Sequence, residues 1–92
     1  MSVLDEIAVR IIKEQALVIG PLAWAEAKKV TGLTADESEG IVAIQSGSKE
    51  VIDRLVAQYE RLFGRASHEV CREAAAKLIA NLPAAEVPAS LR

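Results

Sequence analysis

The sequence predicts a small, mainly α-helical domain with a minor β component, and three observations support this prediction. The chain has 92 residues, which is the size of a single domain. Hydrophobic residues make up 51 % of it but only 3 % of the chain is aromatic, so Ala, Val, Ile and Leu must build most of the core. Apolar positions also recur at helical spacing over most of its length. We expect two N-terminal helices, a short β-hairpin, and then two C-terminal helices or one long helix broken near Gly64.

The N-terminal part of the chain is expected to form two helices. From Val3 to Ile19, apolar residues recur every three or four positions, and the first turn carries two acidic residues where the helix dipole favours negative charge. The pair Gly20-Pro21 ends this helix, because proline disfavours the helical conformation in the residue before it. Proline also suits the first turn of a new helix, so a second, shorter helix is expected from about Pro21 to Val30. Gly32 follows it as a left-handed cap.

Residues 33–47 admit two interpretations. In the first, residues 33–35 and 41–44 are two short strands joined by a polar turn that contains Gly40, and their β-branched residues favour this hairpin. In the second, residues 34–37 form a capping box that opens a helix. Gly40 would then lie inside that helix, at a cost of about 1 kcal/mol relative to alanine. We favour the hairpin.

The C-terminal half carries the clearest helical patterns. A loop at residues 46–48 leads into a helix with one broad apolar stripe, formed by Val51, Ile52, Leu55, Val56, Tyr59, Leu62 and Phe63. Gly64 either ends this helix or lies within a longer one. A last amphipathic stretch precedes Pro83 and contains Val70, Cys71, Ala74, Ala75, Leu78, Ile79 and Leu82. The helical domain is therefore expected over residues 1–83, and residues 84–92, which include Pro88 and little bulk, are expected to be a mobile tail.

Charge and composition argue against several classes of partner. The formal net charge is −2, from 11 basic and 13 acidic residues, which disfavours nucleic acid and anionic membranes as partners. The longest strongly apolar stretch, residues 16–25, is too short to span a bilayer, and the N-terminus has acidic residues where a signal peptide needs basic ones. The lone cysteine, Cys71, cannot form an internal disulfide. A cytoplasmic protein without a membrane partner is expected.

Candidate catalytic or metal-binding chemistry is confined to the neighbourhood of the single histidine, His68. On a helix His68 and Cys71 would point the same way, and two copies across a dimer axis would supply four metal ligands. We favour a structural interpretation, with Cys71 as a small buried residue and His68 at the edge of the apolar stripe. Ser67 is adjacent to His68 and does not face it on a helix. We therefore expect no enzyme, no bound metal and no cofactor.

Two sets of residues are candidates for an interaction surface. The first set is apolar and consists of Trp24, Leu55, Tyr59, Phe63, Leu78 and Ile79. For Trp24 a place in the core is the favoured alternative. The second set is a possible anion-binding ridge, because separations of seven, four and seven would align four arginines on one unbroken helix: Arg54, Arg61, Arg65 and Arg72. A break at Gly64 or neighbouring acidic residues would remove this ridge.

The functional prediction is a non-enzymatic protein-interaction or self-assembly module, either a homodimer or the small subunit of a larger complex. A domain of this size hides only roughly 60 to 65 % of the surface of its unfolded chain, so a second copy would add burial that its own core lacks. The alternative is a small regulatory or nucleic-acid-associated protein that uses the arginine ridge. A metal protein or enzyme centred on His68 and Cys71 is the third hypothesis. The sequence does not identify the partner.

Overall fold

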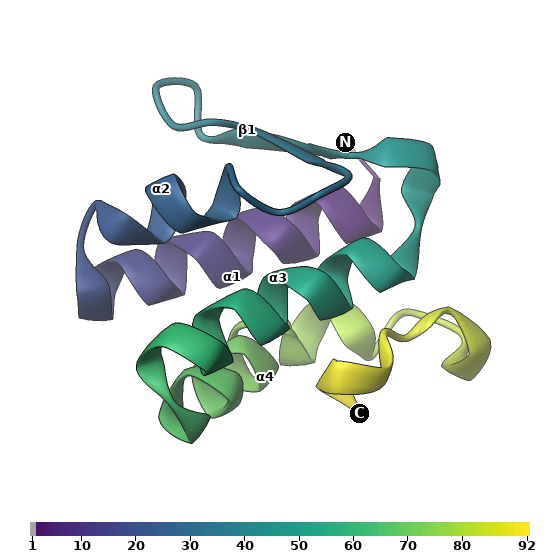
Figure 1. The fold of residues 1–92 in the computed structure, drawn as a ribbon. Helices are drawn as coiled ribbons and strands as arrows, with labels where there is room; N and C mark the ends of the chain where they lie inside the picture. Colours follow the sequence, from purple (N-terminus) through teal and green to yellow (C-terminus); the bar gives the residue numbers. More distant parts are fainter. Residues whose placement is uncertain (1) are drawn as a thin grey trace.

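The structure is a computed structural model that describes residues 2–92. It contains four α-helices and one β-hairpin in the order α1 (Val3–Ile19), α2 (Leu22–Ala27), β1 (Leu33–Asp36), β2 (Ile41–Ile44), α3 (Lys49–Phe63) and α4 (Arg65–Ile79). The hairpin lies on one side, α1 and α2 form the middle layer, and α3 and α4 lie beneath them (Figure 1). The predicted small, mainly helical α+β fold is confirmed. No helix within residues 2–92 is long and apolar enough to cross a membrane.

Helix α1 begins with a capping box and ends at a glycine. The Ser2 side chain accepts a hydrogen bond from the Asp5 backbone N–H at 3.1 Å, and the Asp5 carboxylate accepts one from the Ser2 N–H at 3.2 Å. The second oxygen of the same carboxylate accepts a hydrogen bond from the Ile44 N–H at 2.9 Å, which ties β2 to the start of α1. The helix ends at Gly20, whose φ of +69° is readily adopted only by glycine.

Helix α2 is shorter than predicted. It ends at Ala27, and the chain then turns through two successive backbone hydrogen bonds, Lys29 N–H to Glu26 and Val30 N–H to Ala27. These bonds span three residues instead of four, so residues 28–30 tighten into a turn. The turn allows the chain to leave α2 and enter the hairpin.

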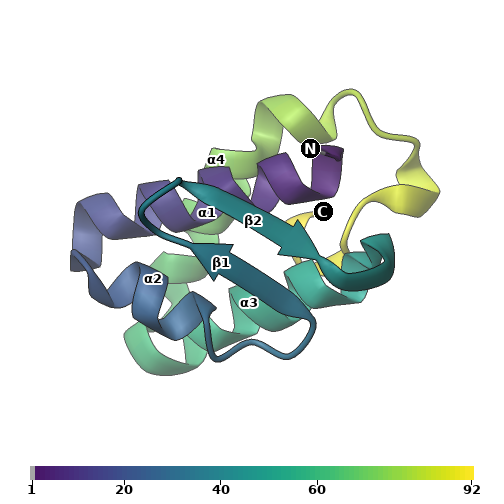
Figure 2. The same cartoon turned by 90° about the horizontal axis from the view of Figure 1, so that it is seen from above.

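Residues 33–44 form the hairpin, and the alternative helix is wrong. Strands β1 and β2 pair antiparallel with Leu33 opposite Ile44 and Asp36 opposite Ile41. Along the strands, Leu33, Val42 and Ile44 are buried while their neighbours are more exposed. A two-stranded hairpin is marginally stable alone. Here its apolar face lies over α1, as Figure 2 shows from above, and this packing supplies the missing stabilisation.

Gly64 separates α3 from α4, so the single long helix is excluded. Its φ is +90°, a conformation that a residue with a side chain rarely adopts, and its N–H closes the last turn of α3 on the Glu60 carbonyl at 2.8 Å. The chain reverses here, and α3 and α4 pack against each other beneath α1 (Figure 1).

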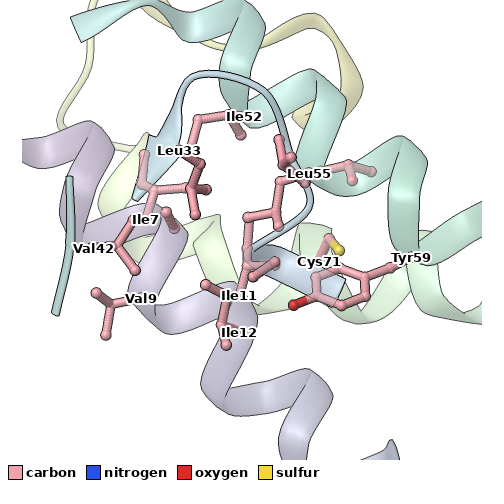
Figure 3. Packing of buried hydrophobic residues seen from close by; sticks show 14 of the residues in the cluster. Ile7, Val9, Ile11, Ile12, Leu33, Val42, Ile52, Leu55, Tyr59 and Cys71 are labelled. Atoms are coloured by element: carbon pink, nitrogen blue, oxygen red, sulfur yellow. The ribbon is translucent and has the colours of Figure 1, made fainter. Parts of the chain in front are cut away.

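The core lies where α1, the hairpin, α3 and α4 meet (Figure 3). Its largest fully buried aliphatic and aromatic side chains are Ile7, Ile11, Ile12, Ile52, Leu55, Val56 and Tyr59. The predicted stripe of α3 is therefore largely buried. Two of its members differ: Leu62 is 44 % exposed, and Phe63 is half-buried against the core.

The C-terminal residues pack against α3 and α4, whereas the sequence predicted a free tail. Two short 3₁₀ turns, η2 (Ala84–Glu86) and η3 (Ala89–Leu91), bring the chain back after Pro83. Val87, Pro88 and Leu91 are buried, and Asp53 of α3 accepts hydrogen bonds from the N–H and hydroxyl groups of Ser90 at 3.0 and 2.6 Å. These few apolar and polar contacts hold a segment whose composition resembles a frayed end.

Candidate interaction surface

Cys71 lies inside the core, where a metal ion or substrate cannot reach it. Its side chain has no exposed surface, and its sulfur lies 3.3 Å from the Gln15 amide nitrogen. Burial raises the pKa of the Cys71 thiol to about 11. The thiol is therefore protonated at neutral pH, and a neutral buried thiol is a poor nucleophile and metal ligand.

His68 lies at the edge of α4 and holds other parts of the fold in place. Its Nε2 donates to the Ser90 carbonyl at 2.6 Å, and its Nδ1 lies 3.2 Å from a carboxylate oxygen of Glu60. Both ring nitrogens are thus engaged, while Cys71 points into the core. Over the described part of the chain, no group of three or more His, Cys, Asp or Glu side chains is placed to hold a metal ion.

The four arginines do not form one ridge, because they lie on two helices separated by Gly64. Three of them hydrogen-bond to nearby groups: Arg54 to the Thr31 carbonyl at 3.2 Å, Arg61 to the Gln58 side chain at 2.7 Å, and Arg72 to the Glu69 carboxylate at 3.3 Å. Arg65 is exposed at the start of α4. The four arginines are therefore separate side chains at the surface and do not form a common binding site.

Most of the predicted apolar interaction residues belong to the core. Trp24, Leu55 and Tyr59 are buried, and the Tyr59 hydroxyl donates to the Ala23 carbonyl at 2.6 Å. Burial also raises the pKa of the Tyr59 phenol. The remaining three, Phe63, Leu78 and Ile79, are half-buried against the same core. A partner cannot contact Leu55 or Tyr59 without opening the domain.

The most exposed bulky apolar residues lie instead at the end of α1 and the start of α2. Leu17 is 81 % exposed, Val18 is 68 % exposed, and Leu22 is 52 % exposed. Leu17 and Val18 lie in the last turn of α1, directly before its final residue Ile19 and the turn at Gly20. Leu17 lies on the polar side of the helix, whereas Val18, seven positions after Ile11, continues the buried side and is exposed in the last turn.

Leu17 and Val18 line a groove between α1 and α4, which we call the α1–α4 groove. At one end of the groove, Leu17 and Val18 of α1 lie across from Val70 of α4. At the other end, Val9 of α1 lies across from Leu78 of α4. The two helices therefore run in opposite directions, as Figure 1 also shows. The groove is lined by Glu6, Val9, Arg10, Lys13, Glu14, Leu17, Val18, Val70, Glu73, Ala74, Lys77 and Leu78.

Charges of both signs line this groove in equal number. The acidic residues are Glu6, Glu14 and Glu73, and the basic residues are Arg10, Lys13 and Lys77. The ion pairs found within residues 2–92 all lie elsewhere, between Lys29 and Glu26, His68 and Glu60, and Arg72 and Glu69. The groove thus combines exposed aliphatic surface with six charged side chains, and none of the six forms an ion pair with another described residue.

The predicted interaction residues include none from the α1 side of this groove, although the sequence contains a signal for one of them. The apolar residues at helical spacing in the first helix include Ile7, Ile11 and Ile12, and this stripe is buried. Leu17 falls outside that stripe, and a bulky aliphatic residue on the polar side of an amphipathic helix is the kind of residue that marks a contact surface. Val18, seven positions after Ile11, continues the stripe and carries no such signal.

No protein-family model, no curated protein and no solved structure matches this chain. The function is therefore argued from the chemistry of the groove. That chemistry is aliphatic side chains together with carboxylates, amines and one guanidinium, on two helices that the core holds in place.

Proposed function

We propose that the chain is a non-enzymatic protein-interaction module that self-associates, as a homodimer or as one subunit of a larger assembly. The observation that carries this proposal is the exposure of Leu17 and Val18, at 81 % and 68 %, in one groove. Contiguous apolar surface is uncommon on a monomeric protein and marks contact sites. Covering it with a second polypeptide removes it from water and adds burial to a small domain.

The placement of the reactive side chains supports a non-enzymatic role. Cys71 is buried as a protonated thiol, and both ring nitrogens of His68 are engaged by Glu60 and Ser90. The α1–α4 groove has no His, Cys, Ser or Thr side chain in its lining. A nucleophile with an adjacent base, which covalent catalysis requires, is therefore missing from the most exposed groove surface.

The proposal places the module in the cytoplasm. Its one cysteine is buried and unpaired, so the fold depends on its packed core without a disulfide. Small domains of secreted proteins commonly rely on several disulfides for stability. A reducing compartment suits this composition.

Molar mass in solution tests the proposal directly. Light scattering coupled to size exclusion should report at least twice the chain mass of 9.9 kDa at micromolar concentration, and the mass should fall as the sample is diluted a hundredfold. Circular dichroism at each concentration provides the control, because the helical signal must stay constant. A mass of one chain at the highest concentration, with the helical signal intact, would contradict self-association.

A further inference from the structure

We propose that the α1–α4 groove is where two copies of this chain meet around a two-fold axis. This inference rests on the proposed function and adds to it the surface and the occupant. In a two-fold contact the same surface of each copy faces the other, so the surface must be complementary to itself. The distribution of charge and apolar area in the groove has this property.

The charges are the first argument for a second copy. The groove carries three acidic and three basic side chains, and none of the six forms an ion pair with another described residue. A strongly acidic or strongly basic partner would set half of these charges against charges of the same sign, which is unfavourable at an interface. A surface that carries both signs avoids this, and a second groove has this composition.

The order of residues along α1 is the second argument. An axis between Arg10 and Glu14 makes the two α1 helices cross antiparallel, which sets Arg10 opposite the partner's Glu14 and Glu14 opposite the partner's Arg10. The same rotation sets Leu17 and Val18 over residues 7 and 6 of the partner's α1, beside the partner's Glu6 and Val9 at the far end of its groove. One operation thus forms two Arg10–Glu14 contacts at the centre and covers the most exposed aliphatic side chains.

The size of the molecule allows such a contact. A specific interface of ordinary size buries about 600 to 1,000 Å² on each partner. The accessible surface of the chain is 5130 Å², so the contact requires between about a tenth and a fifth of it.

A pair of charge-reversed variants tests both the surface and its occupant. In the first variant the groove becomes acidic through Arg10→Glu, Lys13→Glu and Lys77→Glu. In the second it becomes basic through Glu6→Lys, Glu14→Lys and Glu73→Lys. Each variant alone should be monomeric at concentrations where the parent is dimeric, because like charges then face each other. An equimolar mixture should recover the dimer mass, since each groove now meets its opposite.

Two controls separate the groove from charge in general and from the fold. Lys28→Glu, Arg65→Glu and Arg92→Glu together change the net charge as much as the acidic variant does, but at exposed residues outside the groove, and this control should keep the parent's mass. In addition, Leu17→Asp should raise the dimer dissociation constant at least about thirtyfold, as expected for a bulky apolar residue that the contact buries. Leu62 is exposed on α3 and lies outside the groove, so Leu62→Asp should leave the dimer dissociation constant unchanged.

The outcomes distinguish this inference from the proposed function. If the parent remains monomeric, both the proposed self-association and the assignment of the groove to a second copy are wrong. A different polypeptide would then have to cover the groove. A parent that dimerises while the reversed variants and Leu17→Asp dimerise equally well overturns only the assignment of the groove, and self-association stands. If each variant is helical and monomeric but the mixture does not recover the dimer mass, the predicted pairing of charges across the two-fold axis is wrong. If the triple variants do not fold, the comparison of Leu17→Asp with Leu62→Asp decides the question.

Discussion

A comparison of two leucines in helix α3 tests whether tertiary packing or the helical pattern determines how much a side chain contributes to stability. Leu55 and Leu62 are seven residues apart, close to two helical turns, so they lie on nearly the same face of the helix. Leu55 has no exposed surface, whereas Leu62, near the end of α3, is 44 % exposed. We compare Leu55→Ala with Leu62→Ala, two identical chemical changes within one helix.

The structure predicts very different losses for the two variants. Truncating Leu55 removes buried methyl and methylene groups and leaves a cavity beside α1, for a loss in unfolding free energy of about 2 to 5 kcal/mol. A domain of this kind has a total of only about 5 to 15 kcal/mol. Leu62 is already partly in water, so its truncation should cost less than about 1 kcal/mol. Because both changes replace leucine by alanine, their effects on helix propensity cancel in the comparison.

Urea denaturation followed by far-ultraviolet circular dichroism measures both losses. The two variants and the parent are compared at one protein concentration, because association adds to the apparent stability. In thermal unfolding, Leu55→Ala should lower the midpoint by roughly 8 to 40 °C, from about 4 to 8 °C per kcal/mol in a domain of this size. Equal losses for the two variants would refute the burial that the structure assigns to Leu55 and the exposure that it assigns to Leu62.

The other predictions concern the polar side chains of Tyr59, Cys71 and His68. Tyr59→Phe removes the hydrogen bond to the Ala23 carbonyl and should lower the unfolding free energy by about 0.5 to 1.5 kcal/mol in the same urea experiment; no change would mean that this bond is not formed. The Cys71 thiol, with its pKa raised to about 11 and its side chain buried, should react with a thiol reagent at pH 8 at least about a hundredfold more slowly than in the unfolded chain, and a rapid reaction in native buffer would contradict its burial. Because the unfolded thiol ionises first, this group's contribution to stability is complete below a pH of about 9 and is lost as the pH rises toward about 11. Finally, His68→Ala removes the bond to the Ser90 carbonyl, so amide hydrogen exchange should become faster in residues 84–92 and stay unchanged in α1; unchanged exchange in both would show that His68 does not hold this segment.

The sequence by itself determined the local elements, because their causes are local. The three- and four-residue spacing of apolar residues predicted α1, α3 and α4, and the β-branched strands around Gly40 predicted the hairpin. It also limited the break in the C-terminal half to Gly64, although it did not decide whether that glycine ends a helix. These signals act over a few residues, through backbone conformation and one helical or strand face.

The candidate surface was only partly predictable. The sequence suggested self-association and placed its centre on the apolar residues of α3 and α4. The structure buries Leu55 and Tyr59 of α3 in the core, and of the predicted apolar set only Leu78 lines the α1–α4 groove. Periodicity identifies an apolar face, but a core and an interface require the same face.

Only the tertiary structure decided which apolar side chains are left in water and where the chain ends pack. Leu55 and Leu62 have the same sequence signal, and their different burial depends on which other elements pack against each part of α3. Residues 84–92 pack because His68 and Asp53, 22 and 37 positions from Ser90, bind that residue. The groove likewise joins Leu17 of α1 to Val70 of α4. Each of these features depends on contacts between residues far apart in the chain, and no local pattern specifies such contacts because they form only when the helices pack.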